Sequence, residues 1–163
     1  MTMMQIASSD IEAGAVIPFK HVYNRSACTG PNISPSLHWS GAPAGTKSFA
    51  VTVYDPDAPS GSGWWHWMVY DIPPTVQELQ TGAGNKGGSL PDGARQGMTD
   101  YGVKEWGGPC PPPGDKPHRY VFTVFALSVE KLDVPENATS AAIGFELIAN
   151  ALETAQFTAM YGR

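Results

Sequence analysis

The chain has 163 residues, of which 42% are apolar and only 15% are charged, and it contains 18 glycines and 15 prolines. This length fits one compact domain spanning residues 1–163, and the 5 Trp, 6 Tyr and 6 Phe exclude a disordered chain because they supply the apolar surface of a core. The net charge of −5 excludes nucleic acid as a partner, since binding to its phosphates requires a basic surface.

The sequence has no segment of the kind that targets or anchors a protein in a membrane. The first residues, MTMMQIASSDIEAG, lack a basic start and an apolar run, and nowhere do about 18 apolar residues follow one another. A cytoplasmic protein without a transmembrane segment is therefore expected. Cys28 and Cys110 are too few for a disulfide scaffold and lack the CxxC spacing of zinc ligands, so two free thiols are expected in that compartment.

Three segments carry the pattern of β-strands. Residues 48–55, SFAVTVYD, are rich in β-branched and aromatic side chains, and residues 66–72, HWMVYDI, end at two prolines that cannot continue a ladder. These two segments are predicted to pair. Residues 118–127, HRYVFTVFAL, are apolar on both faces, which predicts a central strand covered on both sides.

The C-terminal part contains the one strong helix signal. In residues 140–152, SAAIGFELIANAL, apolar side chains recur with helical spacing behind candidate cap residues between Asn137 and Ser140. A final strand is predicted at residues 156–161. Residues 81–117 have many glycines and prolines and little periodicity, and loops of that length are usually functional. The elements together predict a mostly β protein with one or two helices.

The loop after the first of these strands carries two carboxylates between prolines, in the run DPDAP at residues 55–59. Asp57 is expected to cap the turn. Asp55, at the strand end, either accepts hydrogen bonds from loop amides or orients a histidine. The tight reversal predicts a cis peptide at Ala58–Pro59, because an X–Pro bond costs only about 0.5–1 kcal/mol in the cis form.

The start of the second strand combines a histidine with aromatic side chains. Strand alternation places Trp64 beside His66 on one face, with Trp65 and Trp67 on the other. A histidine in that position is either a structural core residue or an anion ligand that lies beside aromatic side chains at the end of a sheet.

A comparable segment is WGGPCPPPGDKPHRY, residues 106–120. Gly107 and Gly108 allow backbone N–H groups to approach a ligand, and alternation puts His118 and Tyr120 on one face of the strand that follows. The segment is either a phosphate cradle or a rigid surface turn in which His118 caps the strand.

Three separated motifs thus follow one another along the chain: DPDAP at 55–59, Trp-x-His at 64–66 and GGPCPPPGDKPHRYVF at 107–122. Together they resemble the phosphatidylethanolamine-binding protein family, whose members are also called Raf kinase inhibitor-like proteins. The segment Asn32-Ile33-Ser34-Pro35 with Trp39, and the stretch PDAPSGSGWWHWMVYDIP, resemble the bacterial branch. The resemblance extends from about residue 5 to the C-terminus.

The resemblance implies a large antiparallel sheet packed on a smaller one, with a small anion pocket at one end. The pocket takes phosphate or a phospholipid head group and needs no cofactor. Carried over by motif, its ligand-binding residues are Asp55, Trp64, His66, Gly108, Cys110, Pro111, His118 and Tyr120. The resemblance also implies a regulator or inhibitor of a kinase or another protein partner, and bacterial relatives imply a homodimer.

Two departures from the family pattern bear on this pocket. Cys110 stands where better-known eukaryotic members resemble a glycine, so only its backbone N–H is equivalent. The chain also ends at Arg163 without the C-terminal helix that partly covers the pocket in animal relatives. This second departure implies a more open site.

Two other functions would use the same side chains. In a hydrolase acting on a phosphoester, Asp55, His66 and His118 would serve as acid and base, with Cys110 as a nucleophile. In a metal site, the same three side chains would bind zinc. The sequence lacks a P-loop, GxSxG and HExxH, so a binding module is the first interpretation. Its affinity for phosphate is expected to rise as the pH falls from about 8 to 6, because protonated histidines donate from both nitrogens.

Overall fold

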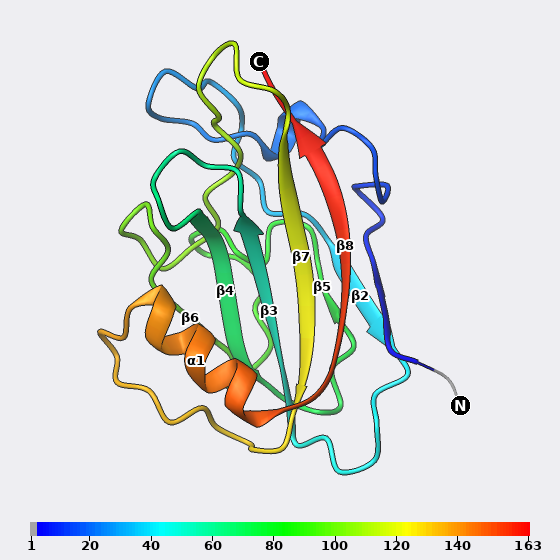
Figure 1. The fold of residues 1–163 in the computed structure, drawn as a ribbon. Helices are drawn as coiled ribbons and strands as arrows, with labels where there is room; N and C mark the ends of the chain where they lie inside the picture. The colour runs from blue at the N-terminus through cyan, green and yellow to red at the C-terminus, as the bar shows by residue number, and fades with distance from the viewer. Residues whose placement is uncertain (1–2) are drawn as a thin grey trace.

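Two antiparallel β-sheets form the protein in the computed structural model, which describes residues 3–163 (Figure 1). The larger sheet has five strands in the order β6-β4-β3-β7-β8, and the smaller has three in the order β1-β2-β5. The elements are β1 (Gln5–Ala7), the 3-10 helix η1 (Phe19–His21), β2 (Leu37–Ser40), β3 (Ser48–Asp55), β4 (Trp64–Ile72), β5 (Glu78–Leu79), β6 (Arg95–Gln96), β7 (His118–Leu127), α1 (Ser140–Asn150) and β8 (Ala151–Tyr161). This architecture confirms the predicted mostly β fold. Within the described part, no helix is long and apolar enough to cross a lipid bilayer.

The two faces of the five-stranded sheet are covered by different elements (Figure 1). One face packs on the three-stranded sheet, where Trp39 and Phe122 belong to the same buried cluster. The other face packs on α1, where Met68 is buried in one cluster with Ile143 and Leu147. Because successive side chains of a strand point to opposite faces, the central strands need apolar residues at nearly every position.

β3 lies at the centre of the large sheet, with β4 on one side and β7 on the other, both antiparallel. The pairing of β3 with β4 confirms the prediction for these two segments. Asp55, the last residue of β3, pairs with Trp64, the first of β4, and Tyr54 pairs with Val121 near the start of β7. The topology therefore brings the start of β7, which is distant in sequence, to the end of the sheet where β3 ends and β4 begins.

The predicted bounds of β3 and β7 are the observed ones, β4, α1 and β8 differ from their predictions at one end, and β1, η1, β2, β5 and β6 were not predicted. β4 begins at Trp64 rather than His66. α1 ends at Asn150, because from Ala151 onward the chain pairs with β7, and the final strand is longer than predicted. The helix begins after Thr139, whose Oγ1 accepts a hydrogen bond from the Ala142 N–H at 3.1 Å.

A β-bulge in β4 changes the predicted faces of its tryptophans. Val53 pairs with Trp67 while Tyr54 pairs with Trp65, so His66 has no residue opposite it. Trp67 is consequently buried between the two sheets, whereas Trp65 packs against the α1 side. The prediction that these two tryptophans share a face is wrong, because strict alternation does not hold across a bulge.

The predicted cis peptide at Ala58–Pro59 is also wrong, since the structure has no cis bond among its described residues. The reversal after β3 is made with trans bonds. The Asp57 N–H donates to Asp55 Oδ1 at 2.8 Å, and the Ser60 N–H donates to the Ala58 carbonyl at 2.8 Å. Local hydrogen bonds of this kind tighten a turn without a cis proline.

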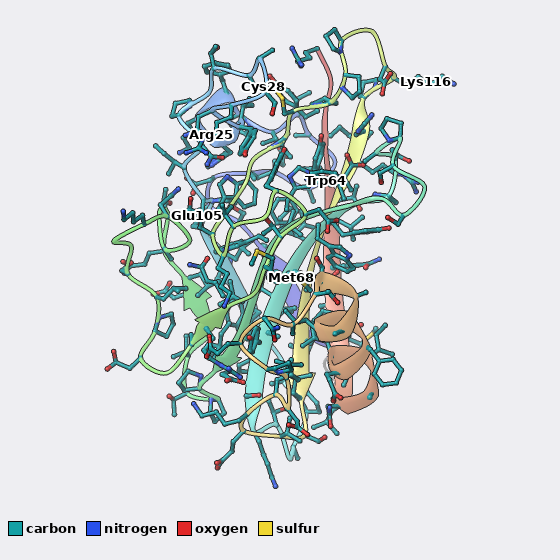
Figure 2. All side chains as sticks on the ribbon, turned by 90° about the vertical axis from the view of Figure 1, so that its left-hand side faces the viewer. Arg25, Cys28, Trp64, Met68, Glu105 and Lys116 are labelled. Carbon is teal, nitrogen blue, oxygen red and sulfur yellow. A yellow bond between two sulfur atoms is a disulfide. The ribbon has the colours of Figure 1, made fainter. Side chains whose placement is uncertain are left out.

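Cys28 and Cys110 form a disulfide, so the prediction of two free thiols is wrong. The two residues are separated by 82 positions in the sequence, which hid their proximity. The chain near Cys28 packs on the loop that carries Cys110, where the Tyr23 N–H donates to the Pro109 carbonyl at 3.1 Å. Figure 2 shows Cys28 at the same end of the molecule as Lys116.

Removing the disulfide in a Cys28→Ser/Cys110→Ser variant is expected to lower the free energy of unfolding by roughly 2–5 kcal/mol, because the cross-link closes a long loop and restricts the unfolded chain. Urea denaturation measures the difference, and reduced wild-type protein should match the variant. A thiol assay on denatured, unreduced protein should detect no free thiol. Two titratable thiols in that assay would contradict the disulfide.

Candidate functional site

Five of the eight predicted site residues lie together where β3 ends and β4 and β7 begin. Asp55 is the last residue of β3, while Trp64 and His118 are the first residues of β4 and β7. His66 and Tyr120 follow on these two strands. The exposed fractions of Asp55, His66, His118 and Tyr120 lie between 1% and 3%. The structure thus brings the predicted polar residues together, but as a buried cluster rather than the more open site expected.

His118 lies between two carboxylates. Its Nδ1 bonds Asp55 Oδ2 at 2.7 Å, and its Nε2 bonds Asp115 Oδ2 at 2.9 Å. Because an ionised carboxylate can only accept, both ring nitrogens donate and the ring is an imidazolium. Burial opposes this charge, but the hydrogen bonds to Asp115 and Asp55 raise the pKa of His118 above its ordinary value. Asp55 also accepts from the Asp57 N–H, so it fulfils both roles considered for it.

His66 differs from His118 in its charge. Its Nδ1–H donates to the Gly107 carbonyl at 2.6 Å, and this bond fixes the hydrogen on Nδ1 because a carbonyl oxygen can only accept. Burial lowers the pKa of His66, and the bond to Gly107 opposes this only in part. The ring is therefore neutral near pH 7, and its Nε2 carries a lone pair that can accept a hydrogen bond.

Two donors of the site are buried and have no acceptor within residues 3–163: the Tyr120 hydroxyl and the Trp64 Nε1–H. The Tyr120 ring lies beside both histidines, with centroid distances of 5.2 Å to His66 and 6.5 Å to His118. Burial, together with the charge of Asp55, raises the pKa of Tyr120, so its hydroxyl stays protonated. Buried polar groups normally find a partner, and these two hydrogens are available to an acceptor that the described part of the chain does not supply.

The glycine loop forms a wall of the site but does not offer its amides to a ligand. The Gly107 N–H donates to the His66 carbonyl at 3.0 Å, and the Gly108 N–H donates to Asn32 Oδ1 at 2.8 Å. A Cβ at Gly108 would overlap the carbonyl of His21, so glycine is required there by the close approach of two backbones. The expectation that these two amides cradle phosphate is therefore wrong.

Cys110 and Pro111 hold the loop next to the cluster. Cys110 is bonded to Cys28, so it has no thiol that could act as a nucleophile. Pro111 is buried, and its carbonyl accepts a hydrogen bond from Arg163 Nε at 2.7 Å. The disulfide and Arg163 thus fix this loop from two sides.

Tyr101 is a residue of the cluster that the sequence analysis missed. Its ring stacks on Tyr23 with a centroid distance of 3.8 Å and lies edge-on to Trp64 at 5.3 Å and to His66 at 5.5 Å. Its hydroxyl donates to the Gly108 carbonyl at 2.8 Å. The available signal was a large aromatic residue within the glycine-rich segment 81–117.

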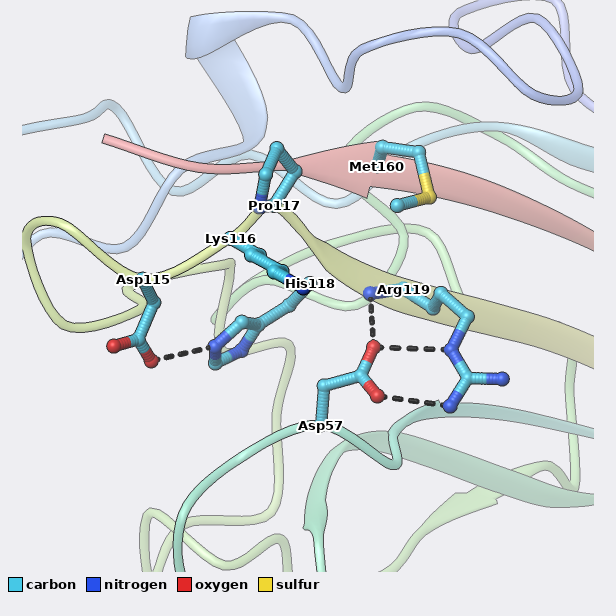
Figure 3. Close-up of a pocket in the computed structure, with 7 residues that line it drawn as sticks. All are labelled: Asp57, Asp115, Lys116, Pro117, His118, Arg119 and Met160. Carbon is cyan, nitrogen blue, oxygen red and sulfur yellow. Dashed lines mark hydrogen bonds and ion pairs between the residues drawn. The ribbon is translucent and has the colours of Figure 1, made fainter.

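A surface groove of about 390 Å³ reaches the cluster at His118 (Figure 3). It is lined by Asp57, Asp115, Lys116, Pro117, His118, Arg119 and Met160, so His118 is the only one of the eight predicted residues that lines it. Asp57 accepts two hydrogen bonds from the Arg119 guanidinium, which lowers the pKa of Asp57 to about 2. Asp57 is therefore the partner of an ion pair rather than the turn cap expected.

The zinc alternative has no geometric support. Among residues 3–163, no group of three or more His, Cys, Asp or Glu side chains is arranged to hold a metal ion. Both nitrogens of His118 donate to carboxylates, and one nitrogen of His66 donates to a carbonyl.

Comparison with known families agrees with this geometry. The family described as phosphatidylethanolamine-binding protein matches residues 7–162. The chain belongs to the phosphatidylethanolamine-binding protein family. Membership confirms the resemblance inferred from the three motifs and explains the arrangement of a large and a small antiparallel sheet.

Within the phosphatidylethanolamine-binding protein family, the chain belongs to the bacterial YbhB/YbcL branch. It is 53% identical to the UPF0098 protein YbcL of Escherichia coli over 96% of this chain and 86% of that protein. The crystal structure of YbcL has a TM-score of 0.96 over 99% of both chains, at 52% identity. The UPF0098 protein YbhB of Escherichia coli is 47% identical over 97% of this chain and 99% of that protein. A family homolog from Chlamydia trachomatis has a TM-score of 0.82 at 33% identity, covering 99% of this chain and 98% of its own.

The two site histidines are expected to titrate on opposite sides of pH 6.5, His118 above it and His66 below it. The stability contributed by the raised pKa of His118 is complete below pH 6.5 and is lost as the pH rises through that pKa. The stability contributed by the lowered pKa of His66 is complete above pH 6.5 and is lost as the pH falls through that pKa. The histidine contribution to stability is therefore largest between the two values.

Side-chain NMR of the histidine nitrogens, assigned with His66→Gln and His118→Gln variants, measures both pKa values and the tautomer of His66. The expected result is a hydrogen on Nδ1 of His66 at neutral pH, with His118 charged. A His66 pKa above that of His118 would contradict the hydrogen bonds described above.

Proposed function

We propose that the protein binds a small phosphate-type anion, such as phosphate or a phosphorylated head group, at the cluster of Asp55, His66, His118 and Tyr120. The observation that carries the proposal is the buried Tyr120 hydroxyl, which has no acceptor in the described part of the chain and lies beside both histidines. A phosphate oxygen would supply this acceptor, and a hydrogen bond to an ionised group is stronger than one between neutral groups.

The charges of the cluster favour such a ligand. The His118 imidazolium compensates the charge of the Asp55 carboxylate in a buried pair. Asp55 therefore does not repel an anion that bonds the nearby donors. Membership in the phosphatidylethanolamine-binding protein family supports the same ligand class.

The protonation states also indicate which form of the anion fits. Tyr120 and Trp64 present hydrogens, whereas neutral His66 presents a lone pair on Nε2. A singly protonated phosphate, free or as a monoester, has oxygens that accept and one P–O–H that donates. This form complements two donors and one acceptor better than a fully ionised phosphate does.

The pKa shifts change the expected pH dependence of binding. A single rise in affinity near pH 6.5 would require both histidines to titrate together. Because burial lowers the pKa of His66 while the carboxylates of Asp115 and Asp55 raise that of His118, two separate steps are expected instead. Affinity decreases as the pH rises through the pKa of His118, which loses its charge, and it decreases again as the pH falls through the pKa of His66, whose Nε2 then no longer accepts from the anion.

The phosphoester hydrolase alternative lacks the nucleophile assigned to it, because Cys110 is in a disulfide. His118 donates from both nitrogens and has no lone pair, so only His66 could act as the base and His118 would be the acid. A kinase or other protein target and a homodimer stay predictions of the family resemblance.

A Tyr120→Phe variant is expected to bind phosphate and phosphoethanolamine about tenfold or more weakly than wild type, because it loses one hydrogen bond to a charged ligand. Isothermal titration calorimetry on folded protein measures the affinity. The matched control is Tyr54→Phe, since the Tyr54 hydroxyl donates to the Ser62 carbonyl and its ring packs on Trp65. This control should bind like wild type.

Equal binding by Tyr120→Phe and wild type would remove the observation on which the proposal rests. Release of inorganic phosphate from a phosphomonoester by wild type, abolished in His66→Gln, would instead favour the hydrolase. The expected result is binding without release.

A further inference from the structure

Asp115 is a carboxylate beside the site to which the proposed function assigns no role in binding the ligand. Its Oδ2 accepts from His118 Nε2 at 2.9 Å, and Figure 3 shows this contact at the edge of the groove. Nε2 is the one N–H of His118 that does not donate to buried Asp55. It is therefore the N–H that an incoming anion would use.

We infer that Asp115 is an internal competitor, whose carboxylate occupies the hydrogen-bonding position on His118 that an external anion would take, and which thereby sets the affinity and the selectivity of the site. This inference rests on the proposed anion binding. An anion oxygen that bonds His118 Nε2 must first displace Asp115, because the two acceptors would share one hydrogen and repel each other.

The two carboxylates on His118 differ in how firmly they are held. The Asp55 side chain is 3% exposed and accepts a second hydrogen bond from the Asp57 N–H. The Asp115 side chain is 39% exposed. Water can solvate Asp115 once it leaves, whereas Asp55 would stay buried without its partner. Asp115 is thus the replaceable ligand of the pair.

The loop around Asp115 allows this exchange. Prolines at positions 112, 113 and 117 have no N–H, so few backbone bonds hold the segment, and the Asp115 N–H makes only a 3.3 Å turn contact with the Pro112 carbonyl. Rotation of the exposed side chain, with no change in the backbone, would free Nε2–H. The groove of about 390 Å³ next to it gives an anion room, with Lys116 and Arg119 among its lining residues.

Competition with a carboxylate predicts selectivity among anions. An incoming acetate only replaces one carboxylate by another and must also lose its freedom of movement, so it gains nothing against Asp115. A phosphate has an oxygen for each of three donors, His118 Nε2–H, the Tyr120 hydroxyl and the Trp64 Nε1–H, whereas acetate has two oxygens in all. Wild type is therefore expected to exclude acetate, and a protein that lacks the Asp115 carboxylate is expected to accept it.

The test compares wild type with Asp115→Asn, Asp115→Ala and a charge-matched control. The control is Asp92→Asn, since Asp92 is exposed and lies with Lys47 and Asp71 at the opposite end of the sheet. Calorimetry with inorganic phosphate should show affinities at least about tenfold higher in both Asp115 variants and unchanged in Asp92→Asn. Acetate should shift the His118 Nε2–H NMR signal of Asp115→Ala and leave that of wild type unchanged.

The outcomes separate this inference from the proposed function. Phosphate binding by wild type that is equal or weaker in both Asp115 variants overturns the competitor role and leaves the anion site standing. An equal gain in Asp92→Asn overturns it too, because overall charge would then be the cause. If no protein binds phosphate, the proposed function fails. The acetate response of Asp115→Ala then still decides whether Asp115 occupies an anion position.

Discussion

The antiparallel pairing of β3 with both of its neighbours is the constraint on which the site depends. Because β4 and β7 run opposite to β3, the end of β3 must meet the starts of both, and Asp55 lies beside the strands that carry His66 and His118. The bulge at His66 then changes the register of β4 near this end. A hydrogen bond of 2.7 Å from His118 to Asp55 then joins the start of β7 to the end of β3, although the two residues are 63 positions apart in the sequence.

Burial leaves one histidine of this cluster charged and the other neutral, because their hydrogen-bond partners differ. Each is almost fully buried, but His118 has a carboxylate on each nitrogen while His66 has a carbonyl on one. In a poorly solvated site, charge is retained only where an opposite charge compensates it. His118 is therefore the cation of the cluster, and His66 supplies a lone pair. A count of histidines in the sequence cannot distinguish these roles, since Gly107 lies 41 positions from His66 and the motif does not show that the Asp115 side chain bonds His118.

Strand and helix patterns predicted β3, β4, β7, β8 and α1, because these follow from local alternation and helical spacing. The two-sheet arrangement and the meeting of Asp55, Trp64, His66, His118 and Tyr120 were implied by the family resemblance. What the sequence could not predict depends on contacts between distant segments. The Gly108 N–H donates to Asn32 Oδ1, and the Tyr101 ring lies edge-on to His66. Cys28 bonds to Cys110 because the chain before Cys28 packs on Pro109. The expectation of a phosphate cradle failed for that reason: the sequence shows that Gly107 and Gly108 lack side chains, but not that protein acceptors already use their N–H groups.

The disulfide bears on the compartment as well as on the site. The expected cytoplasmic location rested on the absence of a targeting pattern and was the basis for expecting free thiols, and it stays a prediction. Disulfides persist mainly in oxidising environments, so the state of the Cys28–Cys110 bond depends on the compartment. The same bond fixes the residue next to Pro111, at the start of the loop that leads to Asp115 and His118. The geometry of the proposed anion site is therefore linked to the redox state of one covalent bond.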